Sequence, residues 1–239
     1  MAEACSIILW GDEMYQYETH LHTFPVSRCA SADVEESLKF YKKLGYDGVF
    51  ITNHFLDGNI NIGKEKSYEE KVEFYFSDYE KGLEIGKNLD IQVFCGVELS
   101  YGGTDFLVYG LDKAWFLSHP EIMDMRKREE LAFMMAEGAL VIQAHPYREA
   151  AYIDHIRLFP RSVHGVEVMN ANRTEAENKM AQIYAEQYNL IPFAGSDNHV
   201  AARQEKLAGI CCRERICSID DFISKIKGNE TKIFTRINE

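Results

Sequence analysis

The chain has 239 residues, of which 46% are apolar, so it is long enough to bury a substantial core as one large domain or two small ones. Its 38 acidic and 26 basic residues give a net charge of −12, which disfavours a protein that binds nucleic acid through a basic face. The longest apolar runs are too short to span a membrane, so we expect no membrane association.

The N-terminal segment 5–10 is apolar but short. It has no basic flank before it and no small-residue cleavage site after it, so we do not expect a signal peptide. The six cysteines include no Cys-x-x-Cys pair, and several lie in apolar, strand-like stretches. This usage predicts reduced thiols in a cytoplasmic protein.

A polar motif ends the first predicted strand, at residues 17–23. Side chains alternate between the two faces of a strand, so Glu18, His20 and His22 share one face. Two imidazoles on one face can bind one metal ion, although an isolated His-x-His is equally consistent with hydrogen-bonded surface histidines. The metal interpretation therefore requires further ligands elsewhere in the chain.

Apolar strands and helical stretches alternate along the rest of the chain, without a Pro/Gly/Ser-rich linker. Further strands are predicted at 46–54, 91–98, 105–111, 139–146, 164–170 and 190–199, with short candidates near residues 210 and 233. Helices are predicted from a cap at Ser31 or Asp33 to residue 44, and at about 67–88, 121–137, 174–188 and 218–227. Such alternation predicts parallel strands with crossover helices, and seven units favour a nearly closed α/β barrel over an open doubly wound sheet.

The predicted strands share one feature, which is that an apolar run ends in a histidine or an acidic residue. These residues are His20 and His22, His54, Glu98, His145, and Asp197 with His199. In α/β barrels the active site is built at the C-terminal ends of the strands. Histidines scattered over a surface would have no reason to keep that position, so the pattern predicts a metal cluster at the mouth of a barrel.

The order of these motifs resembles that of PHP-domain proteins, the polymerase-and-histidinol-phosphatase superfamily of metal-dependent phosphoesterases. The motifs are His20-Leu21-His22-Thr23, Ile51-Thr52-Asn53-His54, Gly96-Val97-Glu98, Ala144-His145-Pro146 and Gly195-Ser196-Asp197-Asn198-His199. The similarity covers about residues 16–200, which implies a single PHP-like domain over 1–239 with a C-terminal strand and helix extension at 201–239. It also implies a distorted seven-stranded, TIM-like (β/α)7 barrel with two or three metal ions at its mouth.

The resemblance also implies a ligand set. His20, His22 and Asp197 would bind a first metal ion, Glu98 would bridge it to a second, and His145 would bind the second. A carboxylate can offer one oxygen to each of two cations, whereas a neutral imidazole serves one. Sites rich in imidazole favour Zn, Mn or Fe over Mg or Ca.

His54 and His199 would hold the third metal ion, but two departures from the family pattern lie beside them. Asn53 stands where many relatives have Asp, and the loop 24–29 lacks the Asp or His that relatives often carry there. For the second metal ion, Asp105 and Asp112 are the available extra ligands. We expect Asp112, because it ends the fourth predicted strand.

Four arginines follow strand-end motifs on predicted loops, namely Arg28, Arg148, Arg173 and Arg203. A guanidinium can hold a phosphate through two parallel hydrogen bonds. Each arginine alone is better explained as a solvated loop residue, but as a set they predict that one or two bind phosphate.

These features predict hydrolysis of a small phosphomonoester, such as histidinol phosphate or a nucleotide, by metal-activated water. The residues expected to serve the reaction are Glu98, His145, Asp197 and His199. Two alternatives remain, a phosphodiesterase of the exonuclease kind, which the acidic balance disfavours, and a metal-binding scaffold without activity. Glu167 is interpreted as a polar residue of a strand, and Asn170 as a candidate substrate contact.

Overall fold

The computed structural model describes residues 14–238, so the apolar segment 5–10 lies outside them. The described residues form one nine-stranded sheet in the order β7-β6-β5-β4-β3-β2-β1-β8-β9. The strands are β1 (Tyr15–Leu21), β2 (Gly48–Ile51), β3 (Gln92–Tyr101), β4 (Thr104–Tyr109), β5 (Leu140–Ala144), β6 (Gly165–Asn170), β7 (Ile191–Gly195), β8 (Lys206–Cys212) and β9 (Thr231–Ile237).

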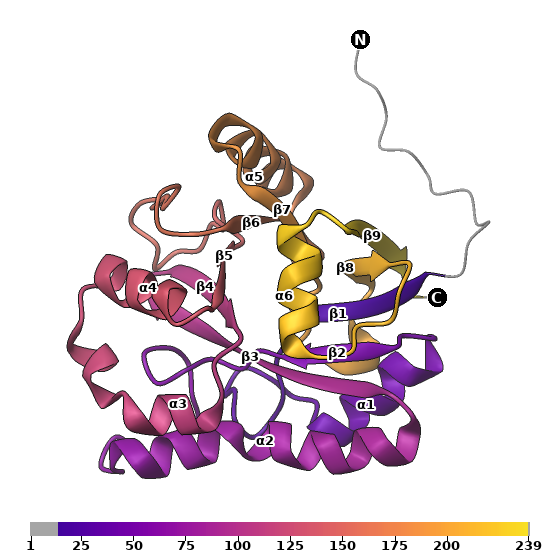
Figure 1. The fold of residues 1–239 in the computed structure, drawn as a ribbon, viewed down its shortest axis with the longest axis horizontal. Coiled ribbons are helices and arrows are strands. Elements are labelled where there is room, and N and C mark those ends of the chain that lie inside the picture. Colours follow the sequence, from indigo (N-terminus) through magenta and orange to yellow (C-terminus); the bar gives the residue numbers. More distant parts are fainter. Residues whose placement is uncertain (1–13, 239) are drawn as a thin grey trace.

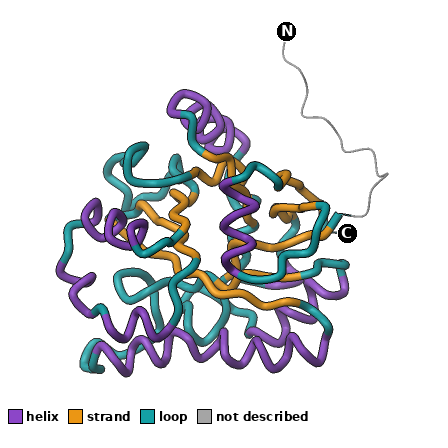
Figure 2. Tube along the Cα trace, in the orientation of Figure 1, coloured by secondary structure: helices purple, strands orange, loops and turns teal. Residues whose placement is uncertain are grey.

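Six α-helices among the described residues cover this sheet (Figures 1 and 2). They are α1 (Val34–Lys43), α2 (Tyr68–Leu89), α3 (Lys113–Ser118), α4 (Lys127–Ala136), α5 (Glu175–Tyr188) and α6 (Ile219–Lys227). Within the described part of the chain, none of them is both long and apolar enough to cross a membrane.

The sheet curls until its first and last barrel strands approach each other. A β-bridge joins Leu21, at the end of β1, to Asn198, just beyond β7. The Asn198 amide donates to His20 O at 3.2 Å, and the His22 amide donates to Asn198 O at 2.9 Å. The barrel is therefore nearly closed, as the alternation of strands and helices predicts.

The prediction of seven parallel strands is wrong in both number and direction. β4 runs antiparallel to both β3 and β5, and β8 and β9 add an antiparallel pair beside β1. The turn between β3 and β4 consists of Gly102 and Gly103, with φ of 57° and 88°. A parallel crossover needs about a dozen residues or more, so a two-residue connection can only reverse the chain.

Capping residues explain where several helices begin. Asp33 accepts a hydrogen bond from the Glu36 amide at 2.9 Å, so Asp33 and not Ser31 begins α1. Ser67 and Thr174 form capping boxes at α2 and α5. The helix predicted at 121–137 is instead a 3-10 turn at Pro120–Asp124 followed by α4.

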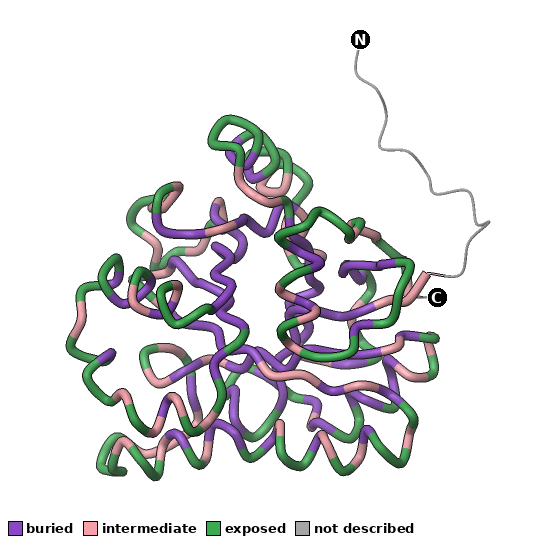
Figure 3. Tube along the Cα trace, viewed as in Figure 1, coloured by how far each residue is buried: buried purple, intermediate pink, exposed green. Residues whose placement is uncertain are grey.

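The core of the barrel closes one of its two ends. Phe222 of α6 packs against Phe50 of β2 and Tyr109 of β4, with ring centroids 4.2 and 5.2 Å apart. Most residues of β1, β2 and β4 to β8 are buried, whereas β9 and the outer helices are partly exposed (Figure 3). With α6 filling one end, only the end where β1, β2 and β5 finish remains open for a site.

Candidate metal centre

Polar side chains from six strands or strand ends meet at the open end of the barrel. They are His20 of β1 with His22 just after it, His54 after β2, Glu98 of β3, Asp105 of β4, His145 after β5, and Asp197 with His199 after β7. All seven residues predicted as ligands thus lie in one cluster. In groups of three, their ligand atoms lie within 4.8 Å of one another.

The tightest group surrounds His20 and His22. The two Nε2 atoms are 3.1 Å apart, and Glu98 approaches them with Oε1 at 3.2 Å and Oε2 at 3.4 Å. Asp197 Oδ1 lies 3.6 and 3.5 Å from the same nitrogens. Ligands bound at about 2.0–2.1 Å in a tetrahedron lie about 3.3–3.4 Å apart. The spacing of His20, His22 and Glu98 is therefore close to that of ligands that share one cation, and Asp197 also groups with His20 and His145.

The buried carboxylate of Glu98 has histidine rings as its neighbours. It is 1% exposed, and among the described residues its close polar contacts are imidazole nitrogens, with His54 Nδ1 2.7 Å from Oε2 and His20 Nε2 3.2 Å from Oε1. Burial alone would raise its pKa, but the adjacent His54 and His20 hold the pKa well below its usual range. An ionised carboxylate surrounded by imidazole nitrogens is what a bridging metal ligand requires.

His22 provides a neutral imidazole ligand beside the Glu98 carboxylate. Burial lowers its pKa well below the ordinary value, and the neighbouring His199 and His54 lower it further. A metal ion binds only the unprotonated imidazole nitrogen. His22 is therefore held in the form that can bind a metal ion.

Two further groups adjoin the first one. His145 Nε2 lies 3.3 Å from Glu98 Oε1 and 3.9 Å from Asp105 Oδ2, so these three residues outline a second position. His22, His54 and His199 outline a third, with the rings of His22 and His199 stacked at 4.1 Å between centroids. Glu98 contacts the first two groups, and its Oε2 lies 2.7 Å from His54 Nδ1.

Two of the six described non-glycine residues with positive φ lie in the cluster. His145 and Asp197 have φ of 22° and 54°, in the left-handed region that residues with a side chain rarely adopt. Such conformations typically cost about 1–3 kcal/mol and persist where the surrounding structure enforces them. Here they turn both side chains from the strand ends into the cluster.

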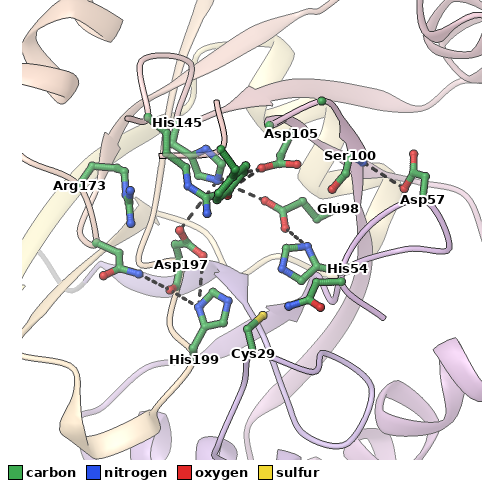
Figure 4. A pocket seen from close by; sticks show the side chains of 16 residues that line it. Cys29, His54, Asp57, Glu98, Ser100, Asp105, His145, Arg173, Asp197 and His199 are labelled. Atoms are coloured by element: carbon green, nitrogen blue, oxygen red, sulfur yellow. Dashed lines mark hydrogen bonds and ion pairs between the residues drawn. The ribbon is translucent and has the colours of Figure 1, made fainter. Parts of the chain in front are cut away.

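A cavity of about 610 Å³ opens above the cluster. Figure 4 shows Glu98, His145, Asp197 and His199 around it, with Arg173 and Asp57 on opposite sides. This volume is in the range of small-molecule sites, about 300–1,000 Å³. The cluster thus forms part of the wall of a pocket large enough for a metabolite.

Neither the family models nor the curated protein sequences contain a match to this chain. Several solved structures match this chain in fold. A two-domain protein from Bacteroides vulgatus ATCC 8482, containing a predicted PHP-like metal-dependent phosphoesterase, superposes with a TM-score of 0.65 at 14% identity, over 98% of this chain and 69% of that one. The chain has the fold of PHP-like metal-dependent phosphoesterases.

Two other solved structures have the same fold. PsfC from Pseudomonas syringae PB-5123 superposes with a TM-score of 0.60 at 16% identity, over 94% of this chain and 91% of that one. An amidohydrolase from Chromobacterium violaceum, solved with bound sulfate, gives a TM-score of 0.51 at 12% identity, over 79% and 89% of the two chains. The similarity to PHP proteins that the motifs indicate is confirmed at the level of fold.

The structure places Asp105, and not Asp112, in this cluster. Asp112 begins α3, where its side chain accepts a hydrogen bond from the Trp115 amide at 2.8 Å. Because β4 is antiparallel, its first residues lie at the open end of the barrel and its last residues at the opposite end. The preference for Asp112 assumed a parallel strand.

The four predicted arginines divide into two pairs. Arg148 and Arg173 line the pocket. Arg28 instead donates to Ile60 O at 3.3 Å, and Arg203 donates to the Ser31 hydroxyl. Neither of these two is among the described residues that line the pocket.

Sequence reasoning missed the role of Glu167. Its Oε1 lies 2.9 Å from His20 Nδ1, and its Oε2 accepts from the His145 amide at 3.0 Å and from Asn170 Nδ2 at 2.8 Å. Second-layer carboxylates of this kind orient metal-binding imidazoles. A lone charge in an otherwise apolar strand is the signal that points to such a role.

Cys29 also reaches the pocket, from the loop that follows His22. Cys29 is exposed, and although desolvation would raise the pKa of its thiol, hydrogen bonds with the side chains of His199 and His54 lower it to about 6. Cys29 therefore stands beside the third position.

Proposed function

We propose that the protein is a metal-dependent hydrolase of small phosphomonoesters, of the histidinol phosphate or nucleotide kind. The observation that carries this proposal is the buried carboxylate of Glu98 among the imidazoles of His20, His54 and His145, at the base of a pocket that two arginines line. Imidazole nitrogens and carboxylates together suit Zn, Mn or Fe.

His20, His22, Glu98 and Asp197 would hold the first metal ion, and Glu98, His145 and Asp105 the second. His54 and His199, with His22, would hold a third. When bound, such metal ions act as Lewis acids and lower the pKa of bound water so that hydroxide forms near neutral pH. Glu167 would keep His20 oriented, since it contacts the ring nitrogen that faces away from the cluster.

Arg148 and Arg173 would bind the phosphoryl oxygens from the side of the pocket. A guanidinium offers paired donors that match two oxygens of a tetrahedral anion. The sulfate of the Chromobacterium violaceum neighbour is an anion of this shape. Arg148 NH1 lies 3.3 Å from Asp105 Oδ2, which connects the arginine wall to the second metal position.

Metal binding should be visible without any substrate. Thermal unfolding after chelation and after addition of Mn, Zn or Fe should show stabilisation by metal, about 2.7 kcal/mol at a metal concentration of 100 times Kd. Glu98→Gln should lose most of this effect, because it removes the bridging charge. Equal midpoints with chelator and with each metal would overturn the metal centre.

Activity should depend on the same residue. With Mn, Zn or Fe present, we expect hydrolysis of 4-nitrophenyl phosphate by the wild type and at least about a hundredfold lower kcat/KM for Glu98→Gln. His119→Ala is the matched control, since this histidine contacts Trp115 away from the pocket. Equal background rates in all three proteins would favour the scaffold alternative. Preference for the diester bis(4-nitrophenyl) phosphate would favour the phosphodiesterase. Hydrolysis of amides alone would favour an amidohydrolase, the activity named for the Chromobacterium violaceum protein.

A further inference from the structure

A chain of hydrogen bonds leads from His22 to a carboxylate on α2. His22 Nδ1 lies 3.0 Å from Ser27 Oγ, and Ser27 Oγ lies 2.8 Å from Asn53 Oδ1. Asn53 Nδ2 lies 2.9 Å from Thr23 Oγ1, which in turn lies 2.7 Å from Asp78 Oδ2. All five residues are at most 3% exposed, so water does not compete for these bonds.

The donors and acceptors that these five side chains offer allow only one direction of donation along the hydrogen bonds. Asp78, as a carboxylate, can only accept, so the one hydroxyl hydrogen of Thr23 points to it. Thr23 Oγ1 must then accept from Asn53 Nδ2, which leaves Asn53 Oδ1 facing Ser27. The Thr23 amide also donates to Asn53 Oδ1 at 2.7 Å, in agreement with this amide orientation.

The last two links set the state of the imidazole. Ser27 gives its hydroxyl hydrogen to Asn53 Oδ1, so its oxygen must accept from His22 Nδ1. The amide of His54 also donates to Ser27 Oγ at 3.1 Å. The single hydroxyl hydrogen of Ser27 is already given to Asn53, so Ser27 cannot donate to the ring of His22. His22 thus carries its hydrogen on Nδ1 and keeps the Nε2 lone pair for the cluster.

We propose that Asp78 is a positioning residue that selects the Nδ1–H tautomer of His22 through Thr23, Asn53 and Ser27. The functional importance of this tautomer rests on the proposed metal centre, but the tautomer itself can be measured in the protein without metal. It also accounts for Asn53, where many PHP proteins carry Asp. Asn53 accepts on one side and donates on the other, which a carboxylate cannot do.

The direct test is the tautomer of His22 in metal-free protein at neutral pH, read from the ¹⁵N shifts of its two ring nitrogens. We expect hydrogen on Nδ1 in the wild type. A hydrogen on Nε2, or equal populations of both tautomers, overturns the proposal. This readout is independent of hydrolysis, so an inactive protein with the Nδ1–H tautomer would contradict the proposed function alone.

Variants of Thr23 test whether the distant carboxylate acts through the chain. Thr23→Val keeps the shape but removes the hydroxyl, so the Nδ1–H tautomer should lose its dominance and the metal Kd should rise about 10- to 100-fold. Thr23→Ser, which restores a hydroxyl, should bind metal within about threefold of the wild type. Unchanged tautomer and affinity in Thr23→Val would overturn the proposal. If Thr23→Val does not fold, Asp78→Asn serves instead, since its amide can reverse the chain and should populate both tautomers.

Discussion

Arg148 and Arg173 both line the pocket, but their existing contacts differ. Arg148 pairs with Asp105 and lies over the ring of Tyr152, with its guanidinium carbon 5.6 Å from the ring centroid. Arg173 has a buried Nε without a hydrogen-bond partner among the described residues. A buried donor left unsatisfied is costly, so an anion in the pocket gains more from Arg173.

At the residue scale we therefore predict that Arg173→Ala raises KM for a phosphomonoester about 10- to 100-fold, the equivalent of a charged hydrogen bond. Arg203→Ala is the matched control, because this arginine contacts Ser31 outside the pocket and should leave KM unchanged. Steady-state kinetics of both variants test this. Equal effects of the two substitutions would mean that net charge, and not contact with the anion, matters.

The β3–β4 hairpin brings Asp105 to the candidate metal centre. Asp105 pairs with Ser100 of β3 and with Ala144 of β5, next to His145. Gly103, in the turn, has φ of 88°, and a Cβ there would lie 2.6 Å from Ile153 Cγ1. A side chain at position 103 therefore requires Ile153 to shift.

At the element scale we predict that Gly103→Ala lowers the free energy of unfolding by about 1–3 kcal/mol and weakens metal binding through Asp105. Gly138→Ala is the control, since Gly138 has φ of 97° but no atom within 4 Å of an added Cβ. It should cost only the backbone strain, about 1 kcal/mol, and leave metal affinity unchanged. Urea unfolding and metal titration measure the two effects. Equal losses in both variants would contradict the steric argument.

At the scale of the whole molecule, a buried ion cluster joins the pocket to α4. Lys127 Nζ lies 2.7 Å from Asp57 Oδ2 and 2.6 Å from Glu130 Oε2. Asp57 lines the pocket and accepts from the Ser100 amide at 3.1 Å. Burial raises the pKa of Glu130 from 4.5 to about 7, although Lys127 opposes the rise.

This pKa makes stability depend on pH. The folded state binds the Glu130 proton more tightly than the unfolded chain, so this contribution is complete below about pH 4.5 and is lost as the pH rises to about 7. Relative to Glu130→Gln, the wild type should lose at most about 3 kcal/mol over that interval. Urea unfolding of both proteins at several pH values measures it. A stability difference that stays constant with pH would contradict the raised pKa.

The sequence by itself determined the pattern of strands that end in histidines and acids. Alternation along each strand and the position of polar residues at its end are local properties, readable from neighbouring residues. Hence His20, His22, His54, Glu98, His145, Asp197 and His199 are all brought into one cluster. The caps of α1, α2 and α5 are local in the same way.

Only the tertiary structure decided what depends on strand direction and on contacts between distant segments. Asp105, and not Asp112, lies in the cluster because the short turn after β3 makes β4 run antiparallel to it. Arg173 and Arg203 both follow a strand-end motif, but Arg173 lines the pocket whereas Arg203 contacts Ser31 outside it. The link from Asp78 to the metal centre likewise spans 55 residues between Thr23 and α2, a separation at which no local pattern specifies a contact.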